Sequence, residues 1–417
     1  MSAAITVAYI FERYPVLTQT FLRRELAGLS GQALRLEIHS MLSPDSDSSC
    51  RRLQKLPDCI PIHYFRWWEA MKLVLAMPRE VWRDPALLRD GWRLCRQYRF
   101  NNWENFTATV WAVIFAFCRA PDFRRRKPDV VHGVRATGPA TAAAILSRLC
   151  GIPFSFGGHA YDIYRHDGDA FLEPKLRAAG FVHTTTQAAK NYLRQHAGGA
   201  AVKIVLARRG LESLPPKMER VAGDRPIALL SVGRLVPKKG HVHQIAACAL
   251  LKSWGISFAA QIIGDGPLRE ELQRKINQAG LRDSVTLCGA LSPEKTDDAY
   301  RWADIFWHTG VVDAEGDRDG LPNVIPEAFA HSLPVIANNL PGTTEAVANG
   351  VNGLVVEVAD AAQLAGAVKR LAENLTLRQT LGENGRRWVE EHFLISRNSE
   401  TLARAFAEAA VNTRPSV

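Results

Sequence analysis

The sequence lacks several features that would each assign it to a particular class of protein. No segment approaches the roughly twenty apolar residues of a transmembrane helix, and the nearest one, Thr107–Cys118, is expected to form a buried helix. The first residues carry no basic leader and no small-residue cleavage site, so Ile5–Phe11 is expected to be a first strand. The 7 cysteines are scattered and have no metal-ligand spacing, which indicates a reduced, cytoplasmic protein.

The loop after this strand also lacks the glycine triad of dinucleotide-binding proteins. It reads FERYPVLTQT, from Phe11 to Thr20. An NAD(P)-dependent oxidoreductase is an alternative, because such enzymes use a similar sheet. The sequence lacks the glycine motif by which these enzymes bind the dinucleotide.

The chain has 417 residues, of which 47% are apolar and 23% charged, and this predicts a globular protein of two domains. Its formal net charge of +10 indicates an anionic partner. Nucleic acid, an acidic membrane surface and phosphorylated substrates all fit that charge.

Short apolar runs alternate with longer amphipathic stretches, which is typical of an α/β protein with doubly wound parallel sheets. Strands are expected in the first half at Ile5–Phe11, Leu34–Ser40, Val130–Gly133, Pro153–Phe156, Phe181–Thr185 and Lys203–Ala207. Strands are expected in the second half at Ile227–Val232, Ser257–Gly264, Ser284–Cys288, Ile305–His308, Pro334–Ala337 and Gly353–Glu357. We therefore predict two Rossmann-like domains, residues 1–207 and 227–390.

A stretch rich in turn residues, 208–226, separates the two halves and is expected to be the linker, because it contains Pro215, Pro216, Gly223 and Pro226. Residues 391–417 are expected to form a helix that packs back on the N-terminal domain.

An insertion at residues 64–127 interrupts the first domain with tryptophans among many arginines. The tryptophans are Trp67, Trp68, Trp82, Trp92, Trp103 and Trp111. On amphipathic helices this composition favours an anionic membrane interface; alternatively, the tryptophans pack inward and the arginines are merely solvated. The run Arg124–Lys127 is interpreted as a solvated helix end, and no nucleic-acid partner is expected because no aromatic nucleic-acid motif accompanies it.

The segment SVGRLVPKKG, Ser231–Gly240, follows the first strand of the second domain. The carboxyl end of such a strand borders the ligand crevice, where Arg234 and Lys239 suit a diphosphate. A basic surface turn is the alternative.

Further on, Asp319 precedes Glu327 by eight positions, and a helix beginning near Asn323 would aim free N–H groups at an anion. An ordinary helix with a solvated glutamate is the alternative there.

These blocks occur in a characteristic order. After SVGRLVPKKG come IIGDGPLREEL, DGLPNVIPEAFAHSLPVIA, PGTTEAV and NGLVVEV. Together they resemble the C-terminal domain of retaining GT-B glycosyltransferases of family 4. In the first half FERYPVLTQTFLRREL, HGVRATGPATAAAIL and GGHAYDIY resemble the exopolysaccharide and colanic-acid branch of that family.

The resemblance implies a GT-B fold of two facing Rossmann-like domains with a central cleft, and it assigns the site residues. It implies that Arg234 and Lys239 hold the donor diphosphate, that Glu327 holds the ribose, and that Asp319 approaches the sugar. The remaining donor-binding residues on this resemblance are Gly264, Gly266, Leu321, Pro322, Asn323 and Val324.

Two positions depart from the family pattern. The family usually has glutamate where this chain has Asp319, so the carboxylate is shorter by one methylene. The family often has Asn-Gly-Val-Asp where this chain has RRGLE at Arg208–Glu212, which Gly210 fits and the arginines do not.

In the first domain, His159 matches the family histidine beside the donor sugar, and with Asp319 and Glu327 it completes the predicted catalytic set. A structural role is the alternative for His159. The segment after the first strand is expected to border the acceptor. Its candidate residues are Tyr14, Thr18, Thr20, Arg23 and Arg24.

Three Asp-x-Asp strings occur, at Asp45/Asp47, Asp167/Asp169 and Asp317/Asp319. Such pairs can hold a divalent metal on a diphosphate. Because Arg234 and Lys239 already supply countercharge, we expect no metal and no other cofactor.

We therefore predict a retaining glycosyltransferase with a nucleoside-diphosphate sugar as donor. The expected acceptor is a saccharide or polyprenyl-linked glycan, used in cell-surface polysaccharide biosynthesis. The expected location is the cytoplasm, peripheral on the inner face of the cytoplasmic membrane. A non-catalytic polysaccharide-assembly protein with the same fold is the alternative, because fold alone does not establish activity.

Overall fold

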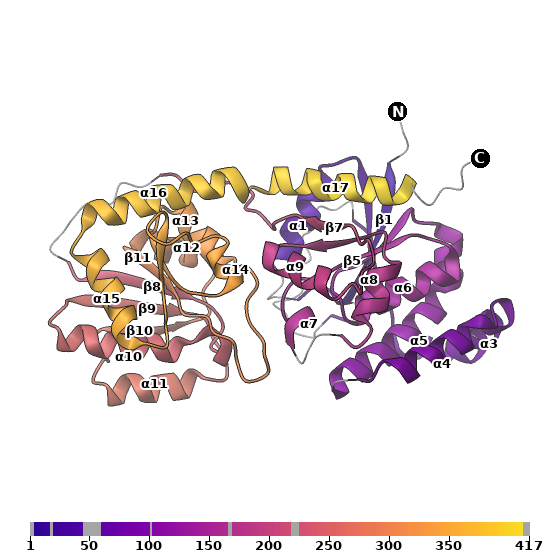
Figure 1. Cartoon of the computed structure of the whole chain (residues 1–417), viewed down its shortest axis with the longest axis horizontal. Helices are drawn as coiled ribbons and strands as arrows, with labels where there is room; N and C mark the ends of the chain where they lie inside the picture. Colours follow the sequence, from indigo (N-terminus) through magenta and orange to yellow (C-terminus); the bar gives the residue numbers. More distant parts are fainter. Residues whose placement is uncertain are drawn as a thin grey trace. The chain divides into compact units, whose positions relative to one another are not determined.

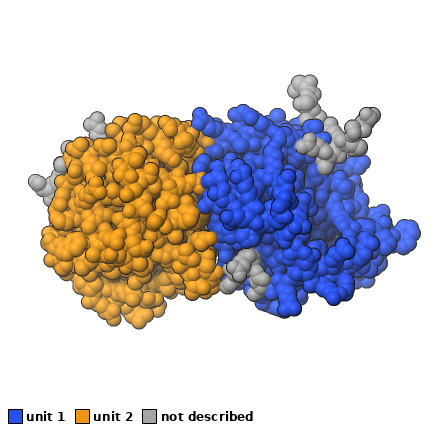
Figure 2. Space-filling model, viewed as in Figure 1, with its two compact units in different colours: residues 1–212, 395–417 blue, residues 213–394 orange. Residues whose placement is uncertain are grey.

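The computed structural model describes residues 4–16, 20–44, 60–100, 102–165, 169–217 and 225–411. The chain forms two compact units, one of residues 1–212 with 395–417 and one of residues 213–394 (Figure 2). The first division, after residue 212, falls within the expected linker at 208–226. The second, after residue 394, lies close to the expected start of the C-terminal segment at residue 391, and from there the chain returns to unit 1.

Unit 1 is built on a seven-stranded parallel sheet with the order β3-β2-β1-β4-β5-β6-β7. Its strands are β1 (Ile5–Arg13), β2 (Leu34–Leu42), β3 (Ile62–Tyr64), β4 (Val130–Gly133), β5 (Phe154–Gly157), β6 (Phe181–Thr184) and β7 (Ile204–Leu206). The strands β4, β5 and β6 are buried along their whole length, as expected for a parallel sheet covered on both faces.

The helices of unit 1 cover both faces of this sheet (Figure 1). They are α1 (Thr20–Ser30), η1 (Trp67–Lys72), α3 (Leu73–Arg83), α4 (Ala86–Gln97), α5 (Trp103–Arg126), α6 (Gly138–Cys150), α7 (Tyr161–Tyr164), α8 (Leu172–Ala178), α9 (Gln187–Gln195) and α17 (Ile395–Val411). Helix α17 packs on α1 and on β1, β4, β6 and β7, so the C-terminal helix belongs to the core of unit 1.

Unit 2 is a second doubly wound domain, with the parallel strand order β10-β9-β8-β11-β12-β13. Its strands are β8 (Ile227–Val232), β9 (Phe258–Ile263), β10 (Val285–Gly289), β11 (Ile305–His308), β12 (Val335–Asn338) and β13 (Gly353–Val356). Its helices are η3 (Pro237–Lys239), α10 (His241–Ser253), α11 (Arg269–Gln278), α12 (Pro293–Trp302), α13 (Val324–Ala330), α14 (Pro341–Thr344), α15 (Ala361–Ala372) and α16 (Leu375–His392).

The predicted α/β fold class with two Rossmann-like domains is confirmed. All twelve predicted strands are present within two residues of their expected ends. The sequence missed β3, because this edge strand has 3 residues and no room for an alternating pattern.

The expectation of a buried helix at Thr107–Cys118 holds for its second half only. This segment lies inside α5, which is long and apolar enough to cross a membrane by length and composition, with 39% of its most apolar window buried. Residues from Ala112 onward pack into the core against α6, whereas Trp103 at the first turn is exposed.

Candidate active site

The sheet of unit 2 has a topological switch point between β8 and β11. From β8 the chain winds outward through β9 and β10, and from β11 it winds the other way through β12 and β13. The loops that leave the carboxyl ends of β8 and β11 therefore diverge and open a crevice, which is where ligands bind in open α/β sheets.

Two lysines after β8 meet two aspartates after β11 at this switch point. The Nζ of Lys239 lies 2.5 Å from Oδ2 of Asp319, and the Nζ of Lys238 lies 2.9 Å from Oδ2 of Asp317. A cross contact of 3.8 Å joins Lys238 to Asp319. The sequence predicted Lys239 and Asp319 as site residues, and the structure brings these two together within one ion-paired cluster.

The electrostatics of this cluster keep Asp319 ionised. Burial opposes its ionisation, but the charge of Lys239 and a hydrogen bond from His308 outweigh burial and hold the pKa of the Asp319 carboxyl well below its usual range. The Nε2 of His308 lies 3.4 Å from Asp319, while burial lowers the pKa of His308 and favours its neutral form. At neutral pH Asp319 can therefore accept hydrogen bonds or stabilise positive charge, but it has no proton to donate.

The loop that carries the lysines is fixed against the end of β11. The hydroxyl of Thr309 donates to the carbonyl of Lys239 at 3.1 Å. Gly240 has a φ of +62°, and a Cβ there would lie 2.0 Å from the carbonyl oxygen of Thr309, so only glycine allows this close approach. The ring of His241 lies 3.3 Å from the carbonyl of Arg234, and burial lowers its pKa to about 4, so it is neutral at pH 7. The side chain of Arg234 is exposed.

Gly264 and Gly266 follow β9, and the structure gives both a packing reason. Gly264 has a φ of +138°, and its Cβ would lie 1.9 Å from the carbonyl oxygen of Gly233. A Cβ on Gly266 would lie 2.6 Å from the carbonyl oxygen of Leu235. These glycines let the loops after β8 and β9 touch backbone to backbone, which places the SVGRLVPKKG loop at the switch point.

The helix α13 carries the remaining predicted donor residues. Glu327 lies in its first turn and accepts a hydrogen bond from the hydroxyl of Tyr300 at 3.2 Å. The ring of Tyr300 stacks on His331 with ring centres 5.0 Å apart. Leu321 and Pro322 before the helix are buried, whereas Asn323 and Val324 are partly exposed.

His159 lies just after β5 in unit 1 and is only 6% exposed. Its backbone N–H donates to Asp162 at 3.2 Å, and its ring packs edge-on against His183 with ring centres 5.1 Å apart. Burial, together with the charges of Arg209 and Arg135, holds the pKa of His159 well below its ordinary value. Its Nδ1 is buried and has no hydrogen-bond partner among the described residues.

The predicted acceptor-side residues differ in their surroundings. Tyr14 is 2% exposed, packs against Phe11 and belongs to the core, a structural role that the sequence did not predict. Arg23 and Arg24 are partly exposed on α1, which begins at Thr20. Thr18 lies outside the described residues.

The other Asp-x-Asp strings do not form comparable clusters in the described chain. Asp45, Asp47 and Asp167 lie outside the described residues. Asp169 is buried and pairs with Lys175 at 2.6 Å, which is a structural ion pair of unit 1.

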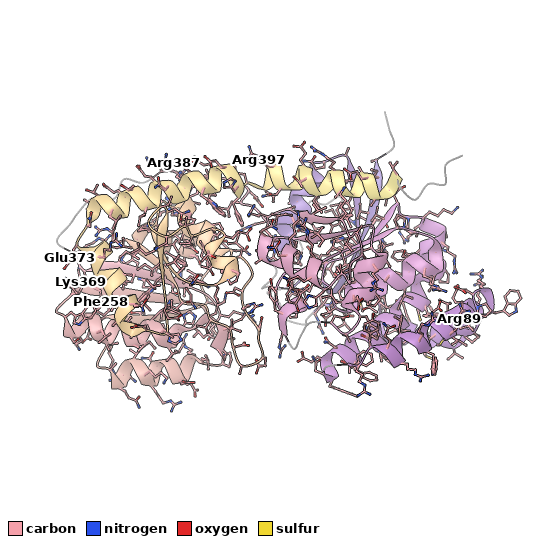
Figure 3. The ribbon with its side chains drawn as sticks, in the orientation of Figure 1. Arg89, Phe258, Lys369, Glu373, Arg387 and Arg397 are labelled. Carbon is pink, nitrogen blue, oxygen red and sulfur yellow. The ribbon has the colours of Figure 1, made fainter. Side chains whose placement is uncertain are left out.

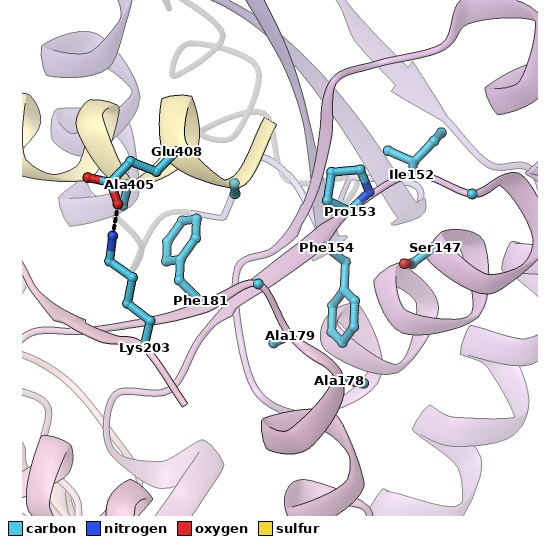
Figure 4. A pocket seen from close by; sticks show the side chains of 13 residues that line it. Ser147, Ile152, Pro153, Phe154, Ala178, Ala179, Phe181, Lys203, Ala405 and Glu408 are labelled. Carbon is cyan, nitrogen blue, oxygen red and sulfur yellow. Dashed lines mark hydrogen bonds and ion pairs between the residues drawn. The ribbon is translucent and has the colours of Figure 1, made fainter. Parts of the chain in front are cut away.

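A hollow of about 370 Å³ lies on unit 1 at the amino ends of β5, β6 and β7 (Figure 4). Its lining includes Pro153, Phe181 and the ion pair between Lys203 and Glu408. Since ligands of doubly wound sheets bind at the carboxyl edge, this hollow is not the candidate site.

Sequence reasoning missed Lys238, Asp317 and His308 as site residues. Lys238 stands inside the segment SVGRLVPKKG, and the sequence marks Asp317 only as part of an Asp-x-Asp string. His308 ends a strand that was predicted correctly, so its position at a carboxyl edge was the available signal.

Comparisons with known proteins agree with this fold, and the family match lies in unit 2. Residues 217–388 match the family described as Glycosyl transferases group 1. The chain is 36% identical over 179 residues to the amylovoran biosynthesis glycosyltransferase AmsK of Erwinia amylovora, covering 42% of this chain and 44% of that protein. It is 31% identical over 211 residues to the putative colanic acid biosynthesis glycosyltransferase WcaL of Salmonella typhimurium, covering 50% and 49%. The chain thus aligns with about half the length of these relatives.

Among solved structures, Anabaena HepE in complex with UDP and glucose superposes with a TM-score of 0.68 and 16% identity, over 97% of this chain and 99% of that one. This likeness shows the fold. The predicted resemblance to glycosyltransferases of exopolysaccharide and colanic-acid biosynthesis is confirmed at the level of these relatives. The chain has the fold of GT-B glycosyltransferases, and its residues 217–388 are similar to the group 1 family.

Proposed function

We propose that the protein transfers a sugar from a nucleoside-diphosphate sugar to a saccharide or polyprenyl-linked glycan, and that it retains the anomeric configuration. The observation that carries the proposal is the cluster of Lys238, Lys239, Asp317 and Asp319 at the switch point of unit 2. The relatives named for amylovoran and colanic acid biosynthesis support a role in cell-surface polysaccharide synthesis. The location that we propose is the cytoplasm, peripheral on the inner face of the cytoplasmic membrane.

The role of the lysines follows from the charge that develops during transfer. Cleavage of the bond between sugar and diphosphate leaves negative charge on the departing diphosphate, and fixed cations stabilise that charge more in the transition state than in the ground state. Lys239 is held by Asp319 and by the contact of its carbonyl with Thr309, so little reorganisation is needed at the moment of reaction. Arg234, which is exposed, adds a guanidinium that can bind phosphate oxygens in two places.

The role of Asp319 follows from its ionised state. The glycosidic carbon gains positive character as the bond breaks, and a carboxylate with a low pKa can stabilise it. Asp319 is one methylene shorter than the glutamate usual in the family, but its carboxylate still contacts Lys238, Lys239 and His308.

The ribose of the donor is assigned to Glu327, whose carboxylate already accepts the hydrogen bond of Tyr300. His159 is assigned to the sugar, because a neutral imidazole can bond to hydroxyl groups without adding charge. We propose that no metal takes part. The carboxylates of the Asp317/Asp319 string are engaged by lysines, and this supports the proposal.

The experiment that tests the function is incubation of the full chain with a panel of nucleoside-diphosphate sugars and glycan acceptors. We expect release of free nucleoside diphosphate and a glycoside whose anomeric configuration, read by NMR, matches that of the donor. An inverted product would contradict retention alone. Absence of turnover, despite donor binding, would favour the non-catalytic assembly protein.

A further inference from the structure

Exposed apolar side chains are concentrated on one part of unit 1, built by η1, α3, α4 and the first half of α5. Of the large apolar side chains that are exposed in the described chain, twelve lie between Trp67 and Val110 and five lie elsewhere. The exposed fractions reach 84% for Trp82, 79% for Leu75 and 75% for Trp67. We call the set the tryptophan surface: Trp67, Trp68, Met71, Val74, Leu75, Met77, Trp82, Leu88, Trp92, Trp103, Phe106 and Val110.

The inward-packing alternative for these tryptophans is therefore wrong for five of the six. Only Trp111 among them packs inward, where its indole N–H donates to the carbonyl of Met41 at 3.0 Å. A patch of this extent on a protein surface marks a site of interaction with a partner or a membrane.

The exposed side chains follow helical periodicity, so each helix turns an apolar stripe outward. On α3 the stripe is Val74, Pro78 and Trp82, spaced by four residues, while Glu80 on another side is buried. On α4, Leu88 and Trp92 share the same spacing. Helix α3 contacts η1, α4 and α5, and η1 also contacts α5. The apolar stripes therefore lie on one layer of packed helices.

Basic side chains flank these stripes. Between Arg66 and Phe106 the chain has eight basic and five acidic residues. All five acids pair with arginines from other parts of unit 1, and the pairs are Glu69–Arg119, Glu80–Arg124, Asp84–Arg148, Asp90–Arg148 and Glu104–Arg165. Three of the acids also pair with basic residues of the layer itself, in the pairs Glu69–Lys72, Glu80–Arg83 and Asp90–Arg89. With eight basic and five acidic residues, the segment keeps a surplus of three positive charges (8 − 5).

Tryptophan and arginine also contact each other on this surface. The guanidinium of Arg66 lies 5.0 Å from the ring centre of Trp68, and that of Arg96 lies 5.3 Å from the ring centre of Trp92. Indole rings favour the headgroup level of a bilayer, and arginines beside them meet anionic headgroups. A protein partner would match the apolar stripes, but the unbalanced arginine charge around them matches an anionic lipid surface.

We propose that the tryptophan surface docks unit 1 onto an anionic lipid bilayer, with the helices lying on the membrane and not crossing it. The second half of α5 is buried in the core, so this helix is held on the unit. Arg89 on α4 is one of the exposed basic residues of the layer (Figure 3), and it pairs with the adjacent Asp90. The inference deepens the proposed location, but it rests on unit 1 alone, so its failure leaves the proposed reaction untouched.

The test is co-sedimentation of the full chain with vesicles of mixed phosphatidylglycerol and phosphatidylcholine, compared with phosphatidylcholine alone. We expect binding to the anionic vesicles at low salt and a clear loss at roughly 0.5 M salt, where headgroup attraction is screened. The paired change Trp82→Ser with Trp92→Ser removes two exposed indoles and should weaken vesicle binding by at least about tenfold. The paired change Arg93→Glu with Arg96→Glu should abolish the preference for anionic vesicles.

Matched controls come from unit 2. Trp254→Ser removes an exposed tryptophan, and Arg387→Glu reverses an exposed charge on α16 (Figure 3). Both should bind vesicles as the unaltered chain does, and circular dichroism melts should show every variant folded. Recovery of the unaltered chain in the supernatant with anionic vesicles at low salt would overturn the proposal. So would self-association that Trp82→Ser with Trp92→Ser abolishes in sedimentation velocity, if no vesicle binding accompanies it.

Discussion

The carboxyl edges of the two sheets carry different chemistry. At the edge of unit 2, Lys238 pairs with Asp317 and Lys239 pairs with Asp319, and the lowered pKa of Asp319 keeps it charged across the neutral range. At the edge of unit 1, His159 packs against His183, and burial keeps the ring of His159 neutral. One edge therefore offers fixed charge, and the other offers an uncharged hydrogen-bonding group beside arginines.

The difference shows that two sheets of the same doubly wound topology can present different chemical groups at their carboxyl edges. A diphosphate needs countercharge that strengthens as the bond breaks, whereas sugar hydroxyls need hydrogen-bond partners whose charge does not change. Removal of a countercharge at the unit 2 edge should therefore act on turnover, and changes at the unit 1 edge should act more weakly.

The largest effect is expected for Lys239→Ala. The lysine is assigned to the departing diphosphate, so turnover should fall by about 10²–10³, or roughly 2.7–4 kcal/mol, with a smaller change in donor affinity. Steady-state kinetics with varied donor measures both. Lys238→Ala is the matched control, since it breaks the pair with Asp317 but leaves Lys239 against Asp319, and it should lose less. Equal losses in the two variants would contradict the separate assignment of Lys239.

A smaller effect of another kind is expected for Glu327→Ala. The carboxylate is assigned to ribose hydroxyls, so apparent donor affinity should weaken by about 1.5–3 kcal/mol while turnover at saturating donor changes little. The variant also removes the acceptor of the Tyr300 hydroxyl. For this reason Tyr300→Phe serves as the control, and it should retain most of the affinity. A fall in turnover with unchanged affinity would move Glu327 out of the ribose site.

His159→Ala should have a still smaller effect, of about 1–1.5 kcal/mol on kcat/KM, because it removes one neutral hydrogen bond. The pKa of His159 in the folded protein lies well below its ordinary value, so the ring is already neutral at a pH equal to that ordinary value and at every higher pH. The activity ratio of unaltered chain to variant should then be flat from about pH 6.5 to 8. The exposed His196→Ala in the same unit is the control and should behave as the unaltered chain. A ratio that falls steeply as pH rises through 7 would indicate a charged His159.

No effect is expected from chelation. If lysines and Arg234 supply the countercharge, turnover should survive EDTA. Loss of turnover in EDTA that magnesium or manganese restores would place a metal at the diphosphate.

The strands could be predicted because burial on both faces requires short runs of apolar and β-branched residues, such as IALLSV at Ile227–Val232. The pairing of Lys238 with Asp317 could not be predicted in this way. The two residues are 79 positions apart and meet only because β8 and β11 are neighbours at the switch point.

The tryptophan surface illustrates a second limit of sequence. Composition showed tryptophan and arginine on amphipathic helices, but the same pattern fits a buried stripe. Whether Trp82 faces solvent or Trp111 faces the core depends on which neighbour covers each helix, and that is decided by tertiary packing.

The most direct test of the central claim, that unit 2 binds a nucleoside-diphosphate sugar at its switch point, is a thermal-shift measurement of the full chain with a panel of such donors. The account predicts that at least one donor raises the melting temperature, since a ligand at a hundred times its dissociation constant adds about 2.7 kcal/mol. It also predicts that Glu327→Ala loses about half of that stabilisation or more at the same donor concentration, whereas the unit 1 surface variant Trp82→Ser keeps it. A panel in which no nucleotide sugar shifts the melting temperature, or an unchanged shift in Glu327→Ala, would contradict the account.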